Sequence, residues 1–282
     1  MNRYSQMVSG QRESYRLKEY LKLMLPGISS GAISNALRQR DILINGERVR
    51  DDVVLHSGDM LDVFTSFERK LPQVVFVDDN ILIVNKPAEL SSVSVLKDEF
   101  SVATWAQSQY PNEDVRVCHR LDYLTGGLLI LARTQAVHEQ VIAAFRNHWV
   151  NKEYVCLVVG SPYPLKRTCD AYLVKNAKTA RVFVCPDERR GAKPIRTTYE
   201  VVKAGAVSRV KVTPHTGRTH QIRAHMAYLG FPLLGDDQYG NREANKGYKA
   251  RCLNLSATKL SFQCEGTLSY LNEKAFSLEA PF

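Results

Sequence analysis

The sequence lacks the cysteine and histidine spacings that bind metals or build a disulfide framework. Its six cysteines are scattered along the chain, with no CxxC pair and no metal-ligand spacing to histidine. His220 and His225 are five residues apart, so they do not share a helical face as a zinc-binding HExxH pair would. We therefore expect reduced intracellular thiols and no metal site.

Long apolar runs and phosphate-binding loops are also missing. No apolar run follows the charges in the opening stretch MNRYSQMVSGQRESYR, and no later segment approaches the length needed to span a bilayer. We therefore expect a cytoplasmic protein without a membrane partner. The sequence has neither a P-loop nor a cluster of metal-binding carboxylates, which argues against a hydrolase of small phosphorylated molecules.

The chain does contain enough apolar sequence for a core, together with an excess of positive charge. Of its 282 residues, 44% are hydrophobic and 24% are charged, so most of the chain is expected to fold. The formal net charge is +9 and the pI is near 9.2. Such an excess is typical of proteins that bind nucleic acid or anionic lipid, but a soluble basic protein without such a partner has the same charge. Composition leaves both interpretations open.

A loss of hydrophobic periodicity divides the chain. The stretch TSFERKLPQ, residues 65–73, carries three charges and a proline, as linkers usually do. We therefore predict a small domain over residues 1–64 and a larger domain over residues 74–282.

The small domain is expected to contain two helices and a hairpin. Apolar residues from Leu17 to Met24 recur at helical spacing, and a second helix follows the candidate cap at Ser29. A hairpin around Asn45-Gly46 and a Gly-Asp turn before a last strand come next. Basic side chains surround these elements: Lys18, Lys22, Arg38, Arg40, Arg48 and Arg50.

Basic residues of this kind more often form a solvated charged face than a binding surface. However, the stretch SSGAISNALRQRDILINGERVRDDVVLHSGDMLDVF resembles the small RNA-binding domain named after ribosomal protein S-four. The shared pattern is a Ser-rich helix start, a basic helix, an NG turn and a GD pair before the last strand. The resemblance covers roughly residues 15 to 64 and implies an α+β RNA-binding domain that uses these basic side chains.

The larger domain is dominated by strands, many of them joined as hairpins. Strands are predicted in VVFVDDNILIVNKP, GLLIL and KEYVCLVVG, and a hairpin in TYEVVKAGAVSRVKVTP. One helix carries Val137, Val141, Ile142 and Phe145 on one face, and THQIRAHMAYLG predicts a short helix capped by Thr219. Because strand-helix-strand repeats are too few for a doubly wound sheet, we predict a mostly antiparallel α+β fold.

The stretch HRLDYLTGG, which begins at His119, sets polar and charged residues directly against an apolar strand. In an extended loop alternate residues point the same way, so Arg120 and Asp122 would share one surface. A cation and a carboxylate would then lie side by side. The alternative is an aspartate that only stabilises its own turn beside Thr125.

Two further stretches bear on this choice. In NKEYVCLVVG, Tyr154 begins a strand, where a tyrosine is usually a packing residue. In PHTGRTHQIRAH, Arg223 lies beside the apolar stripe of a short helix, where a cation is costly unless a carboxylate meets it. We therefore expect an internal acidic partner for Arg223, and Asp122 is a candidate.

Together these three stretches resemble the RluA family of pseudouridine synthases, in the branch that carries an S-four-like domain in front. HRLDYLTGG corresponds to the catalytic motif HRLDxxTSG, NKEYV contains the Lys-x-Tyr element, and GRTHQIRAH corresponds to GRTHQ(I/L)R(V/A)H. Shorter matches are DDNILIVNKP, GFPLLGDDQYG and the ending KAFSLEAPF. The resemblance covers nearly the whole chain and implies a catalytic domain with a mostly antiparallel mixed sheet.

This resemblance implies an enzyme that converts uridine to pseudouridine in structured RNA after flipping out the base. Asp122 would be the nucleophilic or proton-handling carboxylate, Arg223 would pair with it and keep it ionised, and Tyr154 would lie against the target base. Arg120 would help to flip the uridine and fill the gap. Substrate binding is further implied for His119, Thr125, Arg218, Thr219, His220 and Gln221.

RNA is the implied partner, and no cofactor is expected. Because family members with the extra domain mostly act on ribosomal RNA, we expect that target, with transfer RNA as the alternative. We expect the protein to be a monomer.

The sequence departs from the family pattern at three positions. Gly126 replaces the Ser of TSG, Glu89 replaces the Gly of NKPxG, and Ser256 replaces the His of Leu-His-Ala. These departures bear on substrate choice more than on reaction type. The competing hypothesis is a non-catalytic RNA-binding or ribosome-assembly protein, and the intact catalytic residues argue against it.

Overall fold

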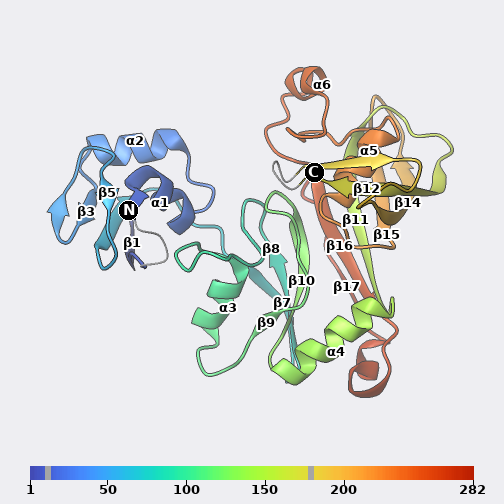
Figure 1. The fold of residues 1–282 in the computed structure, drawn as a ribbon, viewed down its shortest axis with the longest axis horizontal. Helices are drawn as coiled ribbons and strands as arrows, with labels where there is room; N and C mark the ends of the chain where they lie inside the picture. Colours follow the sequence, from blue (N-terminus) through green and yellow to red (C-terminus); the bar gives the residue numbers. More distant parts are fainter. Residues whose placement is uncertain (10–13, 177–180) are drawn as a thin grey trace. The chain divides into compact units, whose positions relative to one another are not determined.

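The computed structural model describes residues 1–9, 14–176 and 181–282, which form two compact units (Figure 1). The first unit comprises Met1–Pro72 and Glu89–Val115, and the second comprises Gln73–Ala88 and Arg116–Phe282. The segment after β8 therefore packs with the front of the chain, although the sequence places it in the larger domain. Among the helices described, none combines the length and the apolar character that a membrane crossing requires.

The first unit contains a small antiparallel sheet and several short helices. Its elements are β1 (Asn2–Met7), β2 (Tyr15–Arg16), α1 (Leu17–Met24), α2 (Ser30–Arg38), β3 (Ile42–Ile44), β4 (Glu47–Arg48), β5 (Val54–Leu55), β6 (Met60–Thr65) and α3 (Val102–Gln109). The sheet has the strand order β1-β6-β3-β4, and β2 pairs with β5 in a separate ribbon. These pairings are all antiparallel.

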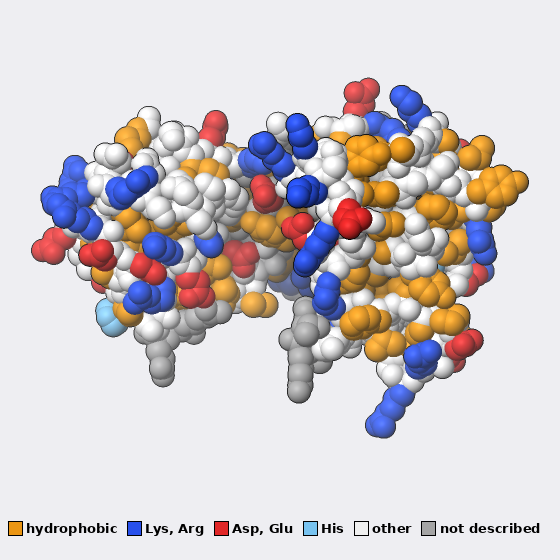
Figure 2. Space-filling model, turned by 90° about the horizontal axis from the view of Figure 1, so that it is seen from above, with side chains coloured by type: hydrophobic (Ala, Val, Ile, Leu, Met, Phe, Trp, Pro, Cys, Tyr) orange, Lys and Arg blue, Asp and Glu red, His pale blue; other side chains and the backbone are white. Residues whose placement is uncertain are grey.

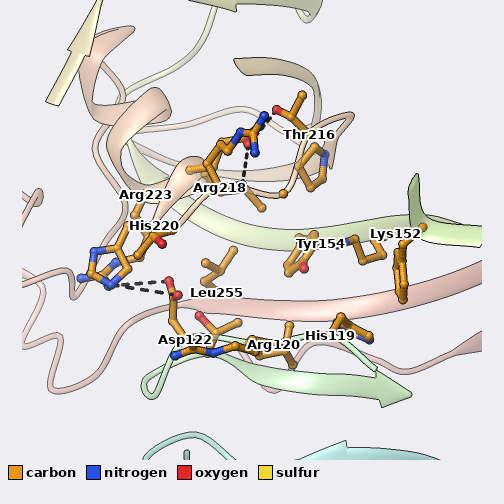
Figure 3. A pocket seen from close by; sticks show the side chains of 18 of the residues that line it. His119, Arg120, Asp122, Lys152, Tyr154, Thr216, Arg218, His220, Arg223 and Leu255 are labelled. Carbon is orange, nitrogen blue, oxygen red and sulfur yellow. Dashed lines mark hydrogen bonds and ion pairs between the residues drawn. The ribbon is translucent and has the colours of Figure 1, made fainter. Parts of the chain in front are cut away.

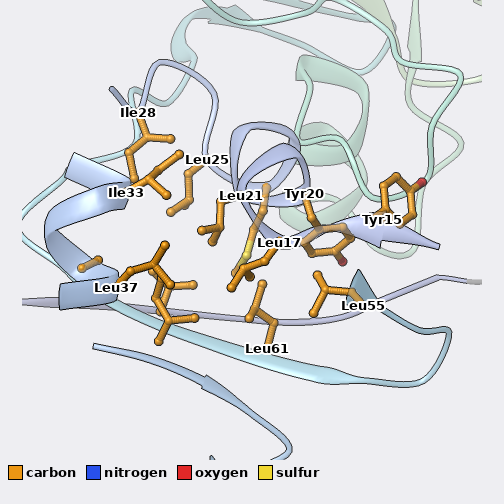
Figure 4. Close-up of a cluster of buried hydrophobic side chains, with 14 of the residues drawn as sticks. Tyr15, Leu17, Tyr20, Leu21, Leu25, Ile28, Ile33, Leu37, Leu55 and Leu61 are labelled. Carbon is orange, nitrogen blue, oxygen red and sulfur yellow. The ribbon is translucent and has the colours of Figure 1, made fainter. Parts of the chain in front are cut away.

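The two helices predicted for the front of the chain are confirmed, and their apolar faces form the core of this unit (Figure 4). α1 buries one face, which includes Leu17, Tyr20 and Met24, at the spacing that helical periodicity requires. α2 begins after Ser29, whose hydroxyl accepts the backbone N–H of Ala32 at 3.0 Å. Apolar periodicity and one cap therefore position both helices.

The predicted hairpin is also confirmed. Asn45 and Gly46 connect β3 to β4 with φ angles of 52° and 85°, and a two-residue type I′ turn requires positive φ at both positions. The Asn45 side chain adds hydrogen bonds to Met60 and Asp59. Strand β1 is not apparent from its sequence NRYSQM because apolar residues are few, and it forms by pairing with β6.

The segment Glu89–Val115 and the expected linker both contribute contacts to this unit. Asp98 is 3% exposed and accepts the backbone N–H and the hydroxyl of Ser9 at 3.0 and 2.7 Å. The Arg69 guanidinium lies 4.0 Å from the centre of the Phe100 ring. Part of the expected linker therefore packs onto the first unit.

The second unit is built on one large sheet. Its elements are β7 (Gln73–Val77), β8 (Ile81–Lys86), β9 (Arg116–Val117), β10 (Gly126–Ala132), α4 (Gln135–Arg146), β11 (Val150–Val159), β12 (Lys166–Lys175), β13 (Val182–Cys185), β14 (Lys193–Lys203), β15 (Val207–Pro214), α5 (Gln221–Tyr228), α6 (Arg242–Gly247), β16 (Leu255–Phe262), the 3-10 helix η1 (Gly266–Leu271) and β17 (Ala275–Ser277). The sheet runs β13-β12-β14-β15-β11-β16-β10-β8-β7, with β9 on β10 and β17 on β16. Among the pairs of named strands that the structure describes, β10 and β16 are parallel and the others are antiparallel, which confirms the predicted fold class.

Two apolar clusters attach helices to this sheet. Val137 and Val141 of α4 pack with Ile130 of β10, on the helix face that the sequence predicts. Ala224 of α5 packs with Ile195 of β14 in a second cluster. The first turn of α5 is therefore fixed relative to the strands that border the site.

Candidate active site

A cavity of about 560 Å³ lies in the second unit, where segments far apart in the sequence meet (Figure 3). Its walls include the loop before β10, the start of β11, and the chain from β15 into α5. It is lined by every residue predicted for catalysis or substrate binding: His119, Arg120, Asp122, Thr125, Tyr154, Arg218, Thr219, His220, Gln221 and Arg223.

The turn that carries Asp122 is held by backbone groups. The Asp122 carbonyl accepts the N–H of Thr125 at 3.0 Å. The Lys86 ammonium, which is fully buried, donates to the carbonyl of Tyr123 at 3.4 Å. Burial lowers the pKa of Lys86 to about 7, although Asp122 opposes this shift. Because the backbone closes the turn, the Asp122 carboxylate is left to face the cavity.

The strand that follows this turn is fixed by the close approach of two backbones. Gly127 of β10 lies opposite Ala257 of β16 in the parallel pair, with a φ of 115°. A Cβ at Gly127 would stand 2.2 Å from the Ala257 carbonyl oxygen, so only glycine fits. At Gly126, where the family usually has Ser, a Cβ would lie 3.2 Å from the Lys86 carbonyl oxygen. The end of the Asp122 turn is thereby locked to β16.

Two side chains at the start of α5 face the Asp122 carboxylate. Arg223 Nη1 lies 3.8 Å from Oδ2, and His220 Nε2 lies 4.0 Å from Oδ1. Burial lowers the pKa of His220 although Asp122 raises it, so this histidine is neutral near pH 7. Its Nδ1 lies 3.0 Å from the Tyr239 hydroxyl, which orients the ring. Both distances exceed a hydrogen bond, so the 27% exposed Asp122 side chain stays open to a substrate.

A second carboxylate, Asp236, binds Arg223 more closely than Asp122 does. Arg223 Nε and Nη2 donate to the two Asp236 oxygens at 2.7 and 2.9 Å, and both side chains are buried. Burial alone would raise the pKa of Asp236, but Arg223 and the backbone N–H groups of Tyr239 and Gln238 lower it overall. The internal partner expected for Arg223 is thus Asp236, and Asp122 is a longer contact on the remaining Nη1. One edge of the guanidinium is fixed while the other faces the cavity.

Tyr154 projects from β11 into the same cavity (Figure 3). Its side chain is buried, and burial, reinforced by Asp122, raises its pKa well above the ordinary value. The hydroxyl therefore stays protonated. Lys152 is two residues earlier on the strand and points to the same side, where it also lines the cavity. Its only signal in the sequence is the Lys-x-Tyr element, and Leu255 of β16 forms a further wall without any such signal.

The prediction that Thr219 caps α5 is wrong. The N-cap residue is His220, whose left-handed backbone, with a φ of 52°, turns its imidazole toward the cavity. Gln221 holds the preceding loop, because its Oε1 accepts the backbone N–H of Arg218 at 3.1 Å. Its amide nitrogen donates to the carbonyl of Arg196 at 3.1 Å. Gln221 therefore shapes the wall of the cavity through internal hydrogen bonds.

The cavity is rich in cations and poor in carboxylates. Its lining carries one carboxylate, that of Asp122, and five cationic side chains: Arg120, Arg146, Lys152, Arg218 and Arg223. Two buried polar atoms of the lining, His119 Nδ1 and Thr125 Oγ1, have no partner among the residues described. The described part of the chain contains no group of three or more His, Cys, Asp or Glu side chains that could hold a metal ion. The arrangement suits a polyanionic substrate.

The chain is similar to proteins of one enzyme family. A family model described as RNA pseudouridylate synthase matches residues 80–228, which include Asp122, Tyr154 and Arg223. Ribosomal large subunit pseudouridine synthase C of Rickettsia conorii is 30% identical over 285 residues, which cover 93% of this chain and 94% of that protein.

Two further similarities extend this result. Dual-specificity RNA pseudouridine synthase RluA of Escherichia coli (strain K12) is 38% identical over 176 residues, covering 61% of this chain and 78% of that protein. The solved structure of Human RNA Pseudouridylate Synthase Domain Containing 1 matches with a TM-score of 0.61 and 24% identity, covering 78% of this chain and 86% of that one. The last likeness concerns the fold alone.

Proposed function

The chain belongs to the RNA pseudouridylate synthase family, and from this premise we propose that it isomerises uridines of large-subunit ribosomal RNA. It is a pseudouridine synthase, an isomerase. The choice of RNA is supported by the Rickettsia relative, which matches along 93% of this chain and is named for the large ribosomal subunit. Transfer RNA is the second candidate, because the RluA relative is named as having dual specificity.

The reaction rearranges one nucleotide without adding or removing an atom overall. The bond from N1 to ribose C1′ breaks, C5 bonds to C1′, C5 loses a proton and N1 gains one. An enzyme reaches these atoms only after the base leaves the stack. Arg120 is exposed and lines the cavity, so its guanidinium can enter the space that the base vacates.

The convergence of Asp122, Tyr154 and Arg223 in one cavity carries this proposal. Asp122 would attack C1′ or transfer the proton, and either role requires a carboxylate that is open to the substrate. Arg223 places a positive charge 3.8 Å from the Asp122 carboxylate, and its position is fixed by Asp236. Tyr154 offers an aromatic wall for the flipped base, and Thr125 offers an unpartnered hydroxyl.

The first unit would hold RNA away from the target uridine. The side chains predicted for this role are all exposed: Lys18, Lys22, Arg38, Arg40 and Arg48. Figure 2 shows Lys and Arg side chains on this unit, at the left of the view, with Asp and Glu side chains among them. Exposed cations bind phosphates without reading sequence, so this unit would add affinity.

Asp122, Tyr154 and Arg223 converge within one chain, and we propose a monomer as the active form. With ribosomal RNA as substrate, the enzyme would act in the cytoplasm, where that RNA is available. Neither role requires a second protein.

The test is to map pseudouridine in ribosomal and transfer RNA from cells with and without the gene. Large-subunit RNA from the deletion strain is then treated with the purified protein and with its Asp122→Asn variant. We expect one or a few large-subunit positions to lose pseudouridine on deletion and to regain it only with the wild-type protein. If the deletion removes pseudouridine from transfer RNA and not from ribosomal RNA, transfer RNA is the substrate. If neither RNA changes, a non-catalytic RNA-binding protein is favoured.

A further inference from the structure

The end of the cavity away from Asp122 contains a second cluster of polar side chains. Figure 3 shows Lys152 and His119 together at that end, with Asp122 at the other. The ring of Phe145 contacts both: the Lys152 ammonium lies 5.0 Å from its centre, and the His119 and Phe145 ring centres are 5.0 Å apart. The isomerisation steps assigned above use neither Lys152 nor Phe145.

Lys152 has a charge that nothing on the described chain neutralises. No carboxylate lies within ion-pair distance of its ammonium among the residues described, and its contact is the face of Phe145. Burial lowers the pKa of Lys152, which reflects the cost of holding an ammonium away from water. A closed complex with RNA would remove the remaining water, so this cation needs an anion from the substrate.

His119 supplies a neutral donor beside this cation. Its Nε2 accepts the backbone N–H of Ile130 at 3.2 Å, and this hydrogen bond assigns the ring proton to Nδ1. Nδ1 is buried and has no partner within the described chain. Burial, together with the charge of Lys152, lowers the pKa of His119 although a backbone contact with Arg120 opposes this shift, so the ring stays neutral. The Nδ1–H group is therefore available as a donor at this end of the cavity.

The charges and rings around Lys152 and His119 indicate which kind of ligand these two donors would bind. The one carboxylate of the lining, Asp122, is at the opposite end, and the exposed Arg146 lines the cavity near Phe145 on α4. A site made of an ammonium, an N–H donor and an apolar ring matches a phosphate with its ribose, because phosphate oxygens carry charge and accept several hydrogen bonds. The keto oxygens of a neutral uracil would leave the ammonium without a counter-charge.

We propose that Lys152 and His119 bind the phosphodiester of a nucleotide that adjoins the target uridine, with its ribose against Phe145. This inference rests on the proposed function and assigns a binding subsite to the same cavity. Lys152 would thereby hold the RNA chain in register while Asp122 acts on the flipped nucleotide.

The test combines a protein change with an RNA change. Lys152→Met keeps the length of the side chain and removes the charge, and methylphosphonate replaces a phosphodiester by a neutral group. The RNA is a short fragment around the mapped uridine, made with methylphosphonate on its 5′ side or on its 3′ side. Lys259→Met is the matched control, because Lys259 pairs with Glu153 at 3.1 Å and does not line the cavity.

We expect Lys152→Met to weaken binding of unmodified RNA by about 10- to 100-fold, the range for one charge-assisted hydrogen bond. The single-turnover rate at saturating RNA should fall by less than about threefold. Methylphosphonate on one of the two sides should weaken wild-type binding to a similar extent and should have little further effect on the variant. The proposal would be overturned if the affinity losses from Lys152→Met and from methylphosphonate were additive for both modified RNAs. It would also be overturned if the single-turnover rate of Lys152→Met collapsed at saturating RNA, because Lys152 would then act at the base.

A second measurement does not depend on activity. Inorganic phosphate is titrated into the full-length protein while the His119 Nδ1–H signal is followed by ¹⁵N-edited NMR. We expect a saturable shift that Lys152→Met abolishes and Lys259→Met retains. If the proposed function is wrong, the wild-type protein will modify no RNA. If only the subsite is wrong, the wild-type protein will be active but its His119 signal will not shift when phosphate is added.

Discussion

The exposed cations of the first unit differ from two cations near Asp122, Arg223 and Lys86, in how far water reaches them. Lys18, Arg38 and Arg48 are exposed, whereas Arg223 is 4% exposed and Lys86, which holds the Asp122 turn, is fully buried. An exposed cation costs little to place and acts on any nearby phosphate, but salt screens it. A buried cation needs a defined partner in a defined place. The first unit is therefore suited to general affinity, and the cavity to chemistry on one nucleotide.

Neutralising Asp122 should give the largest effect and would show that the cavity is the catalytic region. Asp122→Asn should lower the single-turnover rate by at least about 10³-fold, as expected for a group that acts on the reacting atoms. RNA affinity and melting temperature should change little, because the side chain is partly exposed and its turn is closed by backbone groups. The control is Asp187→Asn on the surface. Measurable turnover by purified Asp122→Asn would assign the chemistry to another residue.

The second prediction compares two forked Arg–Asp pairs, one buried and one exposed. Arg223→Ala should lose activity and lower the free energy of unfolding by ~3 kcal/mol, because Asp236 would remain buried without its cation. Arg196→Ala removes a pair of similar geometry with Asp170, at 2.8 and 3.1 Å, in which both side chains are more than half exposed. Solvent screens this exposed pair, so its loss should lower the stability far less than the loss of Arg223 does. Equal losses in urea denaturation would show that burial does not distinguish the pairs.

Buried and exposed histidines should also differ in how they make the stability of the protein depend on pH. His225 is fully buried, and burial lowers its pKa to about 4 despite the opposing charge of Asp170. Below pH 6.5 the unfolded chain takes up a proton that the folded chain refuses until about pH 4, so stability is lost as the pH falls through this window. We expect a loss of ~3 kcal/mol by pH 4. His225→Asn should flatten this part of the curve, and the exposed control His56→Asn should not.

The smallest effect on turnover is expected from the first unit. Replacing five of its exposed cations, Lys18, Lys22, Arg38, Arg40 and Arg48, by Gln should weaken RNA binding and leave the single-turnover rate at saturation unchanged. The slope of log affinity against log salt should become shallower by roughly 0.7 to 0.9 for each RNA phosphate that the variant no longer neutralises. Substitution is preferable to truncation, because Asp98 and Phe100 pack against this unit.

The control for that series carries five Gln substitutions at exposed lysines of the second unit: Lys193, Lys203, Lys211, Lys246 and Lys249. It removes the same charge from the molecule. If both series change the salt slope equally, net charge rather than the first unit determines RNA affinity. A fall in the saturating rate only for the first series would mean that this unit takes part in the chemistry.

Local sequence patterns predicted the elements and residues that depend on short-range physics. Helical periodicity located α1, and the Asn45-Gly46 pair located the hairpin, because each is decided within a few neighbouring residues. Strand β1 escaped prediction because its stability comes from pairing with β6, more than fifty residues later. The cap of α5 was misassigned to Thr219, since a left-handed His220 has no signal in composition.

In the candidate site, too, some features follow from local sequence and others from tertiary packing. Its lining could be predicted because motifs hold its residues at fixed spacings, and the structure places them in one cavity. From the sequence, the partner of Arg223 could be predicted only as a carboxylate. Tertiary packing determines that Asp236 forms the two-point ion pair with Arg223, whereas Asp122 faces the cavity. The free ammonium of Lys152 is likewise a property of its surroundings, since a lysine before a strand is ordinarily solvated.

The packing of Glu89–Val115 on the first unit affects how that unit could be separated from the rest or transferred to another protein. The chain passes between the two units three times, after residues 72, 88 and 115. A protease that cuts after Lys70 would sever one connection and leave the other two intact. A gene fusion that moved only residues 1–72 would lose Asp98, which accepts hydrogen bonds from Ser9, and Phe100, whose ring contacts the Arg69 guanidinium. Residues 1–72 alone are therefore not the whole first unit, which also includes residues 89–115 from within the sequence of the second unit.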